Sequence, residues 1–507
     1  MKENPSVKYD TIIVGAGSAG CVLAARLSED PNRSVLLLEA GPDYPDPSKL
    51  PDDITSSYGA AYSHDWGYES TLAHLKRTIA APRAKLVGGC SATNATIALR
   101  GAASDYDEWA NLGNTGWSFN DVLPFFRKAE HDLDFQSNWH GQKGPLPIRR
   151  YTKKEMTPSQ VAFLEACSKL GFPEVPDLNE PGAIGAGPSP MNSVKGVRQS
   201  TALTYLAAAR QRKNLAIQSG ALVERVLFSG KHAYGVQLAH PSKKILGDQV
   251  ILAGGSYSSP AILMRSGIGP AEDLKALRIK VIKDLIGVGK NLIDHPFLIL
   301  TFSVPPPRNK GAEPFFQTVL TLRSSKAEDS HDLQILAGSI YSSEQSPTGG
   351  LLMLFASVVK PHSRGSLKLR SKNPLTAPVI DLGYFTNPDD LPRMIEAVKV
   401  ARQLAKTAPL ANLIDKELFP GPKNGLEAAV ESGVDTYHHP IGTCKMGPAT
   451  DGEAVVNYRG QVYGVEGLFV IDASIMPTIP SANTNLPTIM LAERCAYWLA
   501  KENSKGS

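Results

Sequence analysis

The chain has 507 residues, of which 42% are hydrophobic and 20% are charged, as in ordinary globular proteins. This composition excludes a wholly disordered chain and a coiled coil, and at roughly 150 residues per domain the length predicts two to four domains or one large interleaved unit. The 53 basic and 49 acidic residues leave a net charge of +4, which is too small to favour a nucleic-acid partner.

The chain contains no stretch of 18 or more apolar residues, so we expect no membrane span. Its N-terminus lacks the pattern of a signal peptide. The five cysteines are Cys21, Cys90, Cys167, Cys444 and Cys495. Because none belongs to a CxxC pair, they indicate neither a disulfide framework nor a thiolate metal site. We expect buried, reduced thiols in a cytoplasmic protein with no bound metal.

The first predicted element is a buried strand at residues 11–14, which is followed by a glycine-rich loop and a segment of helical composition. A second apolar run at residues 34–38 ends at Glu39. This order predicts a strand–helix–strand unit with parallel strands and a right-handed crossover.

The loop after the first strand has the pattern GxGxxG, which is typical of dinucleotide-binding proteins. Glycine permits a tight turn and close approach of the backbone to a pyrophosphate, and the following helix N-terminus offers free N–H groups. The loop residues expected at the pyrophosphate are Gly15, Gly17, Ser18, Ala19 and Gly20. Glu39 stands where a carboxylate can bind ribose hydroxyls, and it would repel the 2′-phosphate of NADP. The motif alone leaves FAD and NAD as alternatives.

Farther along the chain, residues 41–82 are rich in Gly, Pro, Asp and Tyr, which predicts loops. The pattern at residues 105–130 predicts helices on either side of a break at 113–116. Further strands are predicted at 214–218, 222–228, 235–238 and 249–253.

The second half begins with strand-like alternation from about residue 298 to 385, in which residues 303–313 form a turn-rich junction. A helix is predicted at 388–407. The last part returns to a strand at 467–471 and an apolar helix at 488–500. The chain therefore leaves a nucleotide-binding unit and returns to it at its end.

Six motifs resemble, in order, the signatures of the glucose–methanol–choline (GMC) oxidoreductases. The first runs from Arg83 to Asn94 and the second from Gly255 to Pro270. The others lie at residues 287–295, 363–365, 439–444 and 472–477. The resemblance covers the chain from about residue 8 to 500, and it implies FAD rather than NAD.

The resemblance also implies the architecture. We expect an α/β protein with a Rossmann-like FAD-binding domain and a second α+β substrate-binding domain, made of an antiparallel sheet and helices. Residues 1–150, 190–297 and 431–507 would form the FAD-binding domain. Residues 151–189 and 298–430 would form the substrate-binding domain that covers the flavin.

Several residues are expected at FAD because they match the family motifs. Gly88 and Gly89 would let backbone N–H groups approach the flavin, and the backbone of Val223 would hold the adenine. Asp472 would face the ribityl chain and the pyrophosphate, with a helix N-cap as the alternative role. The remaining positions are Arg83, Val87, Ser91, Asn94, Ala95, Ala253, Gly254, Ala473, Asn485 and Pro487.

The first signature also bears on how FAD is held. Some relatives bind FAD covalently through a histidine in this signature. Here Thr93 stands at that place, and no histidine lies between His74 and His131. We therefore expect non-covalent FAD.

Alcohol oxidation requires a base for the hydroxyl proton and an acceptor for the hydride, which the flavin would provide. His439 matches the catalytic histidine of the family. The second family position is His or Asn, and we assign it to Asn485, whose amide N–H would donate to the developing alkoxide. The implied reaction is oxidation of a primary or secondary alcohol to a carbonyl compound, with dioxygen or a quinone-type compound as electron acceptor.

Packing or structural roles, rather than catalytic ones, are expected for the other histidines and aromatic residues near these motifs. His438 is expected to pack beside the site and His295 to belong to a structural turn. Aromatic packing is expected for His64, Trp66, Tyr68 and Tyr437. Two other functions stay open: a GMC-like hydroxynitrile lyase, and a flavin-bound scaffold without turnover.

Overall fold

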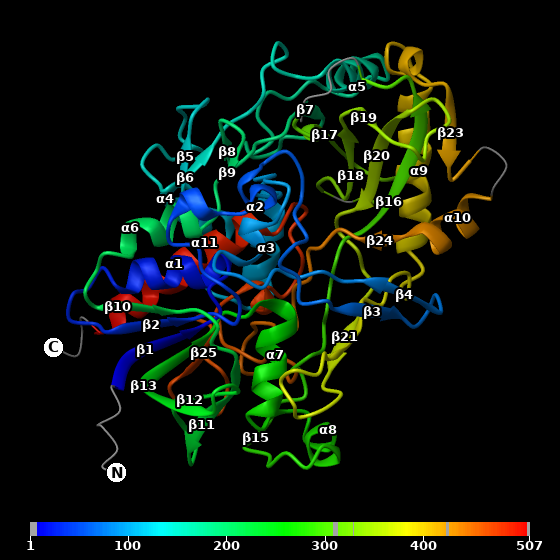
Figure 1. Cartoon of the computed structure of the whole chain (residues 1–507). Helices are drawn as coiled ribbons and strands as arrows, with labels where there is room; N and C mark the ends of the chain where they lie inside the picture. Colours follow the sequence, from blue (N-terminus) through cyan, green and yellow to red (C-terminus); the bar gives the residue numbers. More distant parts are fainter. Residues whose placement is uncertain (1–7, 308–312, 328, 422–424, 504–507) are drawn as a thin grey trace.

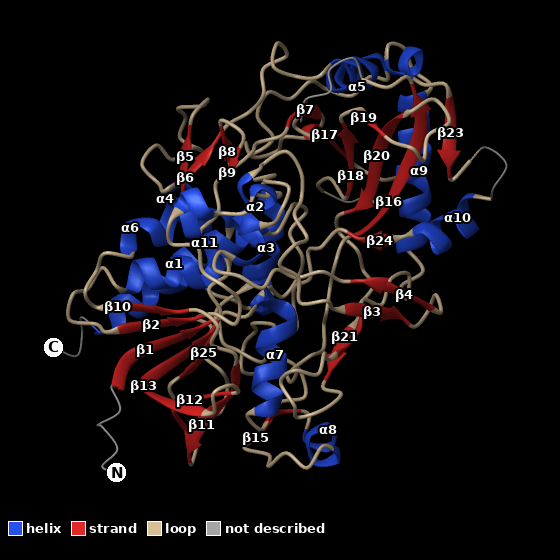
Figure 2. Cartoon of the chain, in the orientation of Figure 1, coloured by secondary structure: helices blue, strands red, loops and turns tan. Residues whose placement is uncertain are grey.

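The computed structural model describes residues 8–307, 313–327, 329–421 and 425–503. It contains two large sheets with helices packed on them (Figures 1 and 2). The first sheet lies near both chain ends, and the second is built from the middle of the chain. The predicted junction at 303–313 lies partly outside the described residues.

The first sheet has seven strands in the order β10–β2–β1–β13–β12–β11, and β25 also pairs with β13. The pairings among β10, β2, β1, β13 and β25 are parallel, whereas β12 and β11 continue the sheet as an antiparallel hairpin. These strands are β1 (Lys8–Val14), β2 (Val35–Leu38), β10 (Leu215–Gln218), β11 (Val223–Ser229), β12 (His232–Leu238), β13 (Lys243–Leu252) and β25 (Leu468–Val470). The predicted Rossmann-like fold is confirmed.

The helix α1 (Ser18–Leu27) follows β1 and lies against β1 and β2, and α11 (Asn485–Asn503) packs against α1. Figure 1 shows these two helices, one from each end of the chain, crossing above the first sheet. The predicted break at 113–116 separates α3 (Ala103–Asn111) from α4 (Phe119–Ala129), and α4 packs on α11. The C-terminal part of the chain therefore returns to the first unit, where α11 packs closely against α1 and α4.

The second sheet has eight strands in the order β23–β16–β20–β18–β17–β7, with β19 on β20 and β24 on β16. All of its pairings are antiparallel. Its strands are β7 (Ala186–Pro188), β16 (Pro296–Val304), β17 (Phe316–Leu322), β18 (Leu333–Gly338), β19 (Tyr341–Ser342), β20 (Gly350–Val358), β23 (Lys416–Phe419) and β24 (Asp435–Thr436). The helices α5 (Pro158–Lys169) and α9 (Asp390–Ala405) pack on it, so the predicted second unit is confirmed as well.

The prediction of loops throughout residues 41–82 is wrong. This segment contains β3 (Glu69–Leu72) and β4 (Arg77–Ala80), which join β21 (Ser366–Lys368) and β22 (Val379–Asp381) in a four-stranded sheet. In β3, exposed and buried residues alternate, but the strand is too short for this alternation to stand out among turn residues. Its partner β22 lies far away in the sequence, so no local signal announces the pairing.

Shorter elements connect these units. They are η1 (Pro47–Lys49), α2 (Asp52–Thr55), η2 (Gly89–Ala92), β5 (Glu130–Asp132), β6 (Leu146–Ile148), β8 (Ser193–Val194), β9 (Val197–Arg198), η3 (Ala202–Leu206), α6 (Ala207–Ala209), α7 (Gly255–Arg265), β14 (Ile268–Gly269), α8 (Ala271–Ala276), β15 (Lys283–Asp284), η4 (Leu410–Leu413), α10 (Leu426–Gly433) and η5 (Ala473–Ile475). Among the described residues, no helix combines the length and the apolar character that crossing a membrane requires.

Candidate active site

A cavity of about 500 Å³ extends from the glycine loop after β1 to the second sheet. Its far wall carries Phe316 from β17, Leu336 from β18 and Phe355 from β20. Most of the predicted site residues line it: Gly15, Gly17, Ser18, Ala19, Glu39, Arg83, Gly89, Asn94, Ala95, Val223, Ala253, Gly254, His439, Asp472, Ala473 and Asn485. One cavity therefore joins the nucleotide loop to the predicted base.

The glycine loop has a backbone that side chains would disrupt. Gly15 has a φ of +102°, and a Cβ atom there would lie 2.6 Å from the carbonyl oxygen of Ala253. A Cβ atom on Gly20 would lie 1.8 Å from the carbonyl oxygen of Gly15. Gly17 is the N-cap of α1 and has no side chain to cap the helix, so the first N–H groups of α1 stay available for an anion.

The first signature rests directly on this loop. The Gly88 N–H donates to the carbonyl oxygen of Ala16 at 2.7 Å. Gly89 has a φ of +50°, and a Cβ atom on it would lie 2.6 Å from the Cα atom of Gly17. Glycine at position 89 is therefore required for the two backbone segments to approach each other beside the cavity.

Glu39 is held at the end of β2 by the backbone. One carboxylate oxygen accepts from the N–H of Ala16 and the other from the N–H of Gly41, both at 2.9 Å. Burial raises the pKa of Glu39, although these hydrogen bonds act in the opposite direction. Each oxygen keeps a further lone pair, which can accept from a ribose hydroxyl in the cavity.

Asp472 ties two elements together beneath the cavity. One carboxylate oxygen accepts from the Gly255 N–H at 2.8 Å and from the Ser259 hydroxyl at 2.6 Å, at the start of α7. The other accepts from the Ser474 N–H at 2.8 Å, so the N-cap role considered as an alternative is present, on η5. These hydrogen bonds fix the side chain of Asp472, which is one of the residues that line the cavity.

Five predicted cofactor residues do not line the cavity: Gly20, Val87, Gly88, Ser91 and Pro487. Ser91 is buried, and its hydroxyl donates to the Gly88 carbonyl oxygen at 2.6 Å. Gly20 and Pro487 lie in α1 and α11, and the other three lie within two residues of Gly89, which lines the cavity.

His439 lies between two partners. Its Nδ1 is 3.0 Å from Nδ1 of His295, and its Nε2 is 3.2 Å from Nδ2 of Asn483. Its backbone N–H donates to Oδ1 of Asp294 at 2.7 Å. Burial lowers the pKa of His439 well below its usual range, and the neighbouring His295, His438 and Arg83 act in the same direction. The imidazole is therefore neutral near pH 7, as a general base requires.

The structure places the two asparagines of the Ser481–Asn485 segment differently. Asn483 contacts the base, and its Oδ1 is buried and has no hydrogen-bond partner among the described residues. Asn485 is the first residue of α11, and its Oδ1 accepts from the Ser18 hydroxyl at 2.8 Å in the nucleotide loop. The motif-based prediction names Asn485 alone, and Asn483 lies only two residues before it, with no local pattern that distinguishes the two.

Several other histidines and aromatic residues near the motifs line the cavity too. His64, Trp66, Tyr68, Tyr437 and His438 all line it. Tyr437 packs on the His439 ring with centroids 4.5 Å apart and donates to Oε1 of Gln334 at 2.7 Å. His438 has a φ of +65°, so adjacent residues 438 and 439 differ in backbone conformation.

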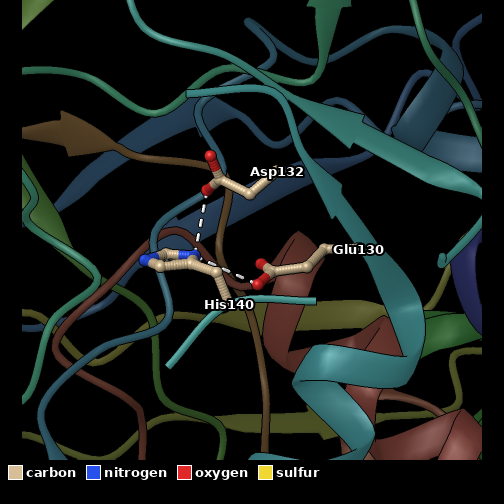
Figure 3. A group of neighbouring side chains, drawn as sticks. All are labelled: Glu130, Asp132 and His140. Atoms are coloured by element: carbon tan, nitrogen blue, oxygen red, sulfur yellow. Dashed lines mark hydrogen bonds and ion pairs between the residues drawn. The ribbon is translucent and has the colours of Figure 1, made fainter. Parts of the chain in front are cut away.

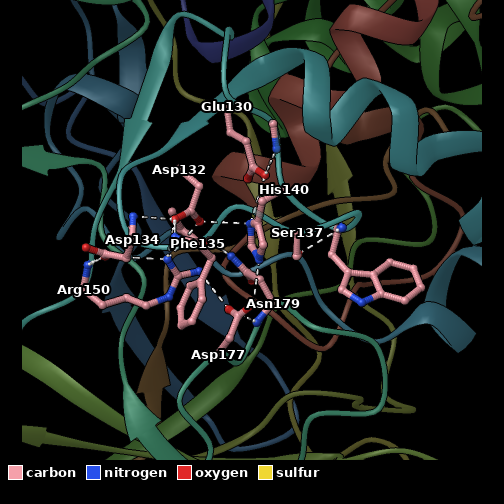
Figure 4. Close-up of polar contacts among 12 residues, drawn as sticks. Glu130, Asp132, Asp134, Phe135, Ser137, His140, Arg150, Asp177 and Asn179 are labelled. Carbon is pink, nitrogen blue, oxygen red and sulfur yellow. Dashed lines mark hydrogen bonds and ion pairs between the residues drawn. The ribbon is translucent and has the colours of Figure 1, made fainter.

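A second group of ionisable side chains lies outside the cavity (Figures 3 and 4). Nδ1 of His140 is 2.9 Å from Asp132 and 3.1 Å from Glu130, and Nε2 is 2.6 Å from Asp177. Arg150 pairs with Asp132 and Asp177, and Arg100 pairs with Glu130. The three buried carboxylates are thus matched by three cations when His140 is protonated, and a fourth carboxylate, Asp134, is 37% exposed and lies 3.8 Å from Arg150. A metal ion here would have to displace a cation that is already paired.

The residues of the cavity fit FAD. The free N–H groups of α1 suit a pyrophosphate, the Glu39 carboxylate suits ribose hydroxyls, and the glycine contacts leave backbone groups open to a flat ring. Thr93 also lines the cavity, at the place where some relatives carry a linking histidine.

Comparisons with known proteins agree with this geometry. Two family models described as GMC oxidoreductase match residues 9–297 and 361–492. The chain is 37% identical to mitochondrial choline dehydrogenase of Mus musculus, over 96% of this chain and 89% of that one. It is 34% identical to glucose dehydrogenase (FAD, quinone) of Drosophila pseudoobscura pseudoobscura, over 99% of this chain and 88% of that one.

Among solved structures, pyridoxine 4-oxidase from Mesorbium loti is similar to this chain with a TM-score of 0.90 and 32% identity. The match covers 97% of this chain and 99% of that one.

Proposed function

The chain belongs to the GMC oxidoreductase family, whose members use FAD to oxidise CH–OH donors, and from this membership we propose that His439 is its catalytic base and Asn483 the partner of that base. The substrate would be a primary or secondary alcohol, which becomes a carbonyl compound. The observation that carries the proposal is the 3.2 Å approach of His439 Nε2 to Asn483 Nδ2 on the wall of the cavity.

The proposed roles follow from what each atom can do. An alcohol oxygen placed near both side chains donates its proton to the lone pair of His439 Nε2 and accepts an N–H from Asn483 Nδ2. FAD, when bound, supplies the acceptor for the hydride that the alcohol carbon loses. The proton therefore ends on Nε2 as the C=O bond forms, and the Asn483 N–H stabilises negative charge on the oxygen.

Asn485 keeps a place in this proposal, but a different one from the sequence-based assignment. Its bond to Ser18 joins the start of α11 to the pyrophosphate loop. We therefore infer that Asn485 supports cofactor binding, while Asn483 takes the role near the substrate oxygen.

Further parts of the proposal concern the cofactor and the surroundings of the enzyme. Non-covalent FAD is supported by Thr93 in the first signature, and dioxygen or a quinone-type acceptor would reoxidise it. A cytoplasmic location is supported by the five free cysteines, of which Cys90 alone is not fully buried. The division into domains at 1–150, 190–297 and 431–507 against 151–189 and 298–430 is supported by the two large sheets, with β24 as a short exception at residues 435–436. The four-stranded sheet crosses this division, because β3 and β4 lie in the first set of ranges and β21 and β22 in the second.

The proposal is tested by a panel of alcohols mixed anaerobically with the FAD-loaded protein. At least one alcohol should bleach the visible flavin band and yield the matching aldehyde or ketone. If no alcohol bleaches the flavin while a cyanohydrin is cleaved, the protein is a lyase and the proposal fails. If nothing reacts, the protein is a scaffold and the proposal fails as well.

A further inference from the structure

We propose that His295 is a positioning residue that fixes the proton of neutral His439 on Nδ1, so that Nε2 presents its lone pair to the substrate. This inference deepens the proposed function and rests on it for its catalytic meaning. The His295–His439 contact itself is open to a separate test. His295 was expected to belong to a structural turn, and nothing in its local sequence predicts contact with the base.

His295 contacts the proposed base, His439, from a position outside the cavity lining. It lies directly before β16, is fully buried, and does not line the cavity. Its ring stands at 85° to the ring of His439, with centroids 5.2 Å apart and the two Nδ1 atoms 3.0 Å apart. The preceding residue, Asp294, accepts the backbone N–H of His439 at 2.7 Å. One short segment therefore holds both the backbone and the ring of the base.

The Nδ1–Nδ1 contact has room for one proton, because two N–H groups would repel and two lone pairs would leave no hydrogen bond. In the first arrangement the proton is on His439, so Nε2 of His439 carries a lone pair and His295 carries its own proton on Nε2. In the second arrangement the proton is on His295, so His439 carries an N–H on Nε2 and cannot accept a proton there.

The group at one end of the pair favours the first arrangement. Nε2 of His295 is buried and has no hydrogen-bond partner among the described residues, so it does not distinguish the two arrangements. At the other end, Nδ2 of Asn483 is a donor and requires a lone pair on His439 Nε2. Burial lowers the pKa of His295 to about 3, so this ring is neutral and has a single proton to place.

The charges around the pair do not oppose this arrangement. Asp105 raises the pKa of His295 and Lys360 lowers it. Arg83 and His438 lower the pKa of His439. The second arrangement would set an N–H of His439 against the N–H of Asn483.

The first test is the tautomer itself, measured by ¹⁵N NMR of histidine-labelled, FAD-loaded protein. We expect the His439 signals to show Nδ1–H and those of His295 to show Nε2–H, with assignment from His439→Gln and His295→Asn. A control variant, His331→Leu, removes another buried imidazole without touching His439 and should leave the His439 signals unchanged. Nε2–H on His439 in the wild-type protein would overturn the inference, whatever the activity is.

The second test compares two replacements of His295. Asn can place an oxygen near the former Nδ1 and still accept from His439, whereas Leu fills a similar volume without an acceptor. Anaerobic flavin reduction should stay within about tenfold of wild type in His295→Asn and fall by about 10² in His295→Leu, with substrate affinity unchanged in both. Equal rates in the two variants, each with the wild-type flavin spectrum, would show that His295 only fills space. If instead His439→Gln reduces flavin normally, the proposed function fails while the tautomer measurement still stands.

Discussion

Replacing His140 by Gln should destabilise the protein strongly, because this side chain completes the charge balance of a buried cluster (Figure 4). Glu130, Asp132 and His140 have side chains that are 0% exposed. With His140 protonated, the three buried carboxylates face three cations, whereas the fourth carboxylate, Asp134, is partly exposed. The variant leaves one buried negative charge without a partner. Removing one member of a buried ion pair costs roughly 3–5 kcal/mol. We expect about 3 kcal/mol, because the Gln amide can still donate to Asp177.

The effect should depend on pH in a defined direction. Burial acts to lower the pKa of His140, but hydrogen bonds to Asp132, Asp177 and Glu130 raise it to about 10. A pKa raised above the unfolded value, roughly 6.5, means that the stabilisation is complete below that pH and is lost as the pH rises through 10. The difference between wild type and His140→Gln should therefore be largest near pH 6 and shrink toward pH 10.

The assay is urea unfolding at both pH values, followed by circular dichroism and by flavin release so that coincident transitions justify a two-state analysis. The matched control is His131→Gln, because His131 lies on the same strand, β5, but is exposed. The control should change the free energy of unfolding by less than about 0.5 kcal/mol. If the two variants unfold alike at pH 6, the charge-balance reasoning is refuted.

Three further predictions concern the cofactor and the substrate partner. Acid precipitation should leave the yellow flavin in the supernatant, since Thr93 offers no imidazole for a covalent link; colour in the pellet would contradict this. Gly89→Ala should weaken FAD binding by at least about tenfold in a fluorescence titration, because its Cβ atom would lie 2.6 Å from Gly17 Cα; unchanged affinity would refute the close approach. Asn483→Leu should slow anaerobic flavin reduction by about 10²–10³ with FAD retained, whereas Asn485→Leu should mainly weaken FAD binding; the reverse pattern would return the catalytic role to Asn485.

Much of the first sheet could be predicted because its signals are local. The end of β1 and all of β2 are buried, largely apolar runs, the glycine pattern stands between β1 and α1, and the apolar stretch in α11 has helical spacing. Steric limits at Gly15 and Gly20 depend on backbone conformation, which the loop motif already implies. Such features need no knowledge of distant parts of the chain.

The role proposed for Asn483 near the substrate could not be predicted in the same way. The motif-based prediction names Asn485 alone, and Asn483 lies two residues before it in a segment without periodicity. What separates them is where α11 begins: Asn485 is its first residue and turns toward Ser18, whereas Asn483 precedes the helix and faces His439.

The two other contacts that the sequence analysis missed depend on long-range packing. His295 and His439 are 144 residues apart and meet because the segments next to them pair at Ile293 and Ile441. The His140 cluster likewise gathers charges from separate loops, and each of its members is an ordinary polar residue in its local sequence. Their burial and their pairing arise only in the folded structure.

Anaerobic stopped-flow reduction of the FAD-loaded protein tests most directly whether His439 is the catalytic base. With the best alcohol from the panel, His439→Ala should keep the flavin spectrum of the oxidised protein and lose about 10²–10⁴ in the rate of flavin reduction. His438→Ala, the neighbouring control on the same cavity wall, should lose less than about tenfold. Normal reduction in His439→Ala, with the large loss in His438→Ala, would contradict the central claim.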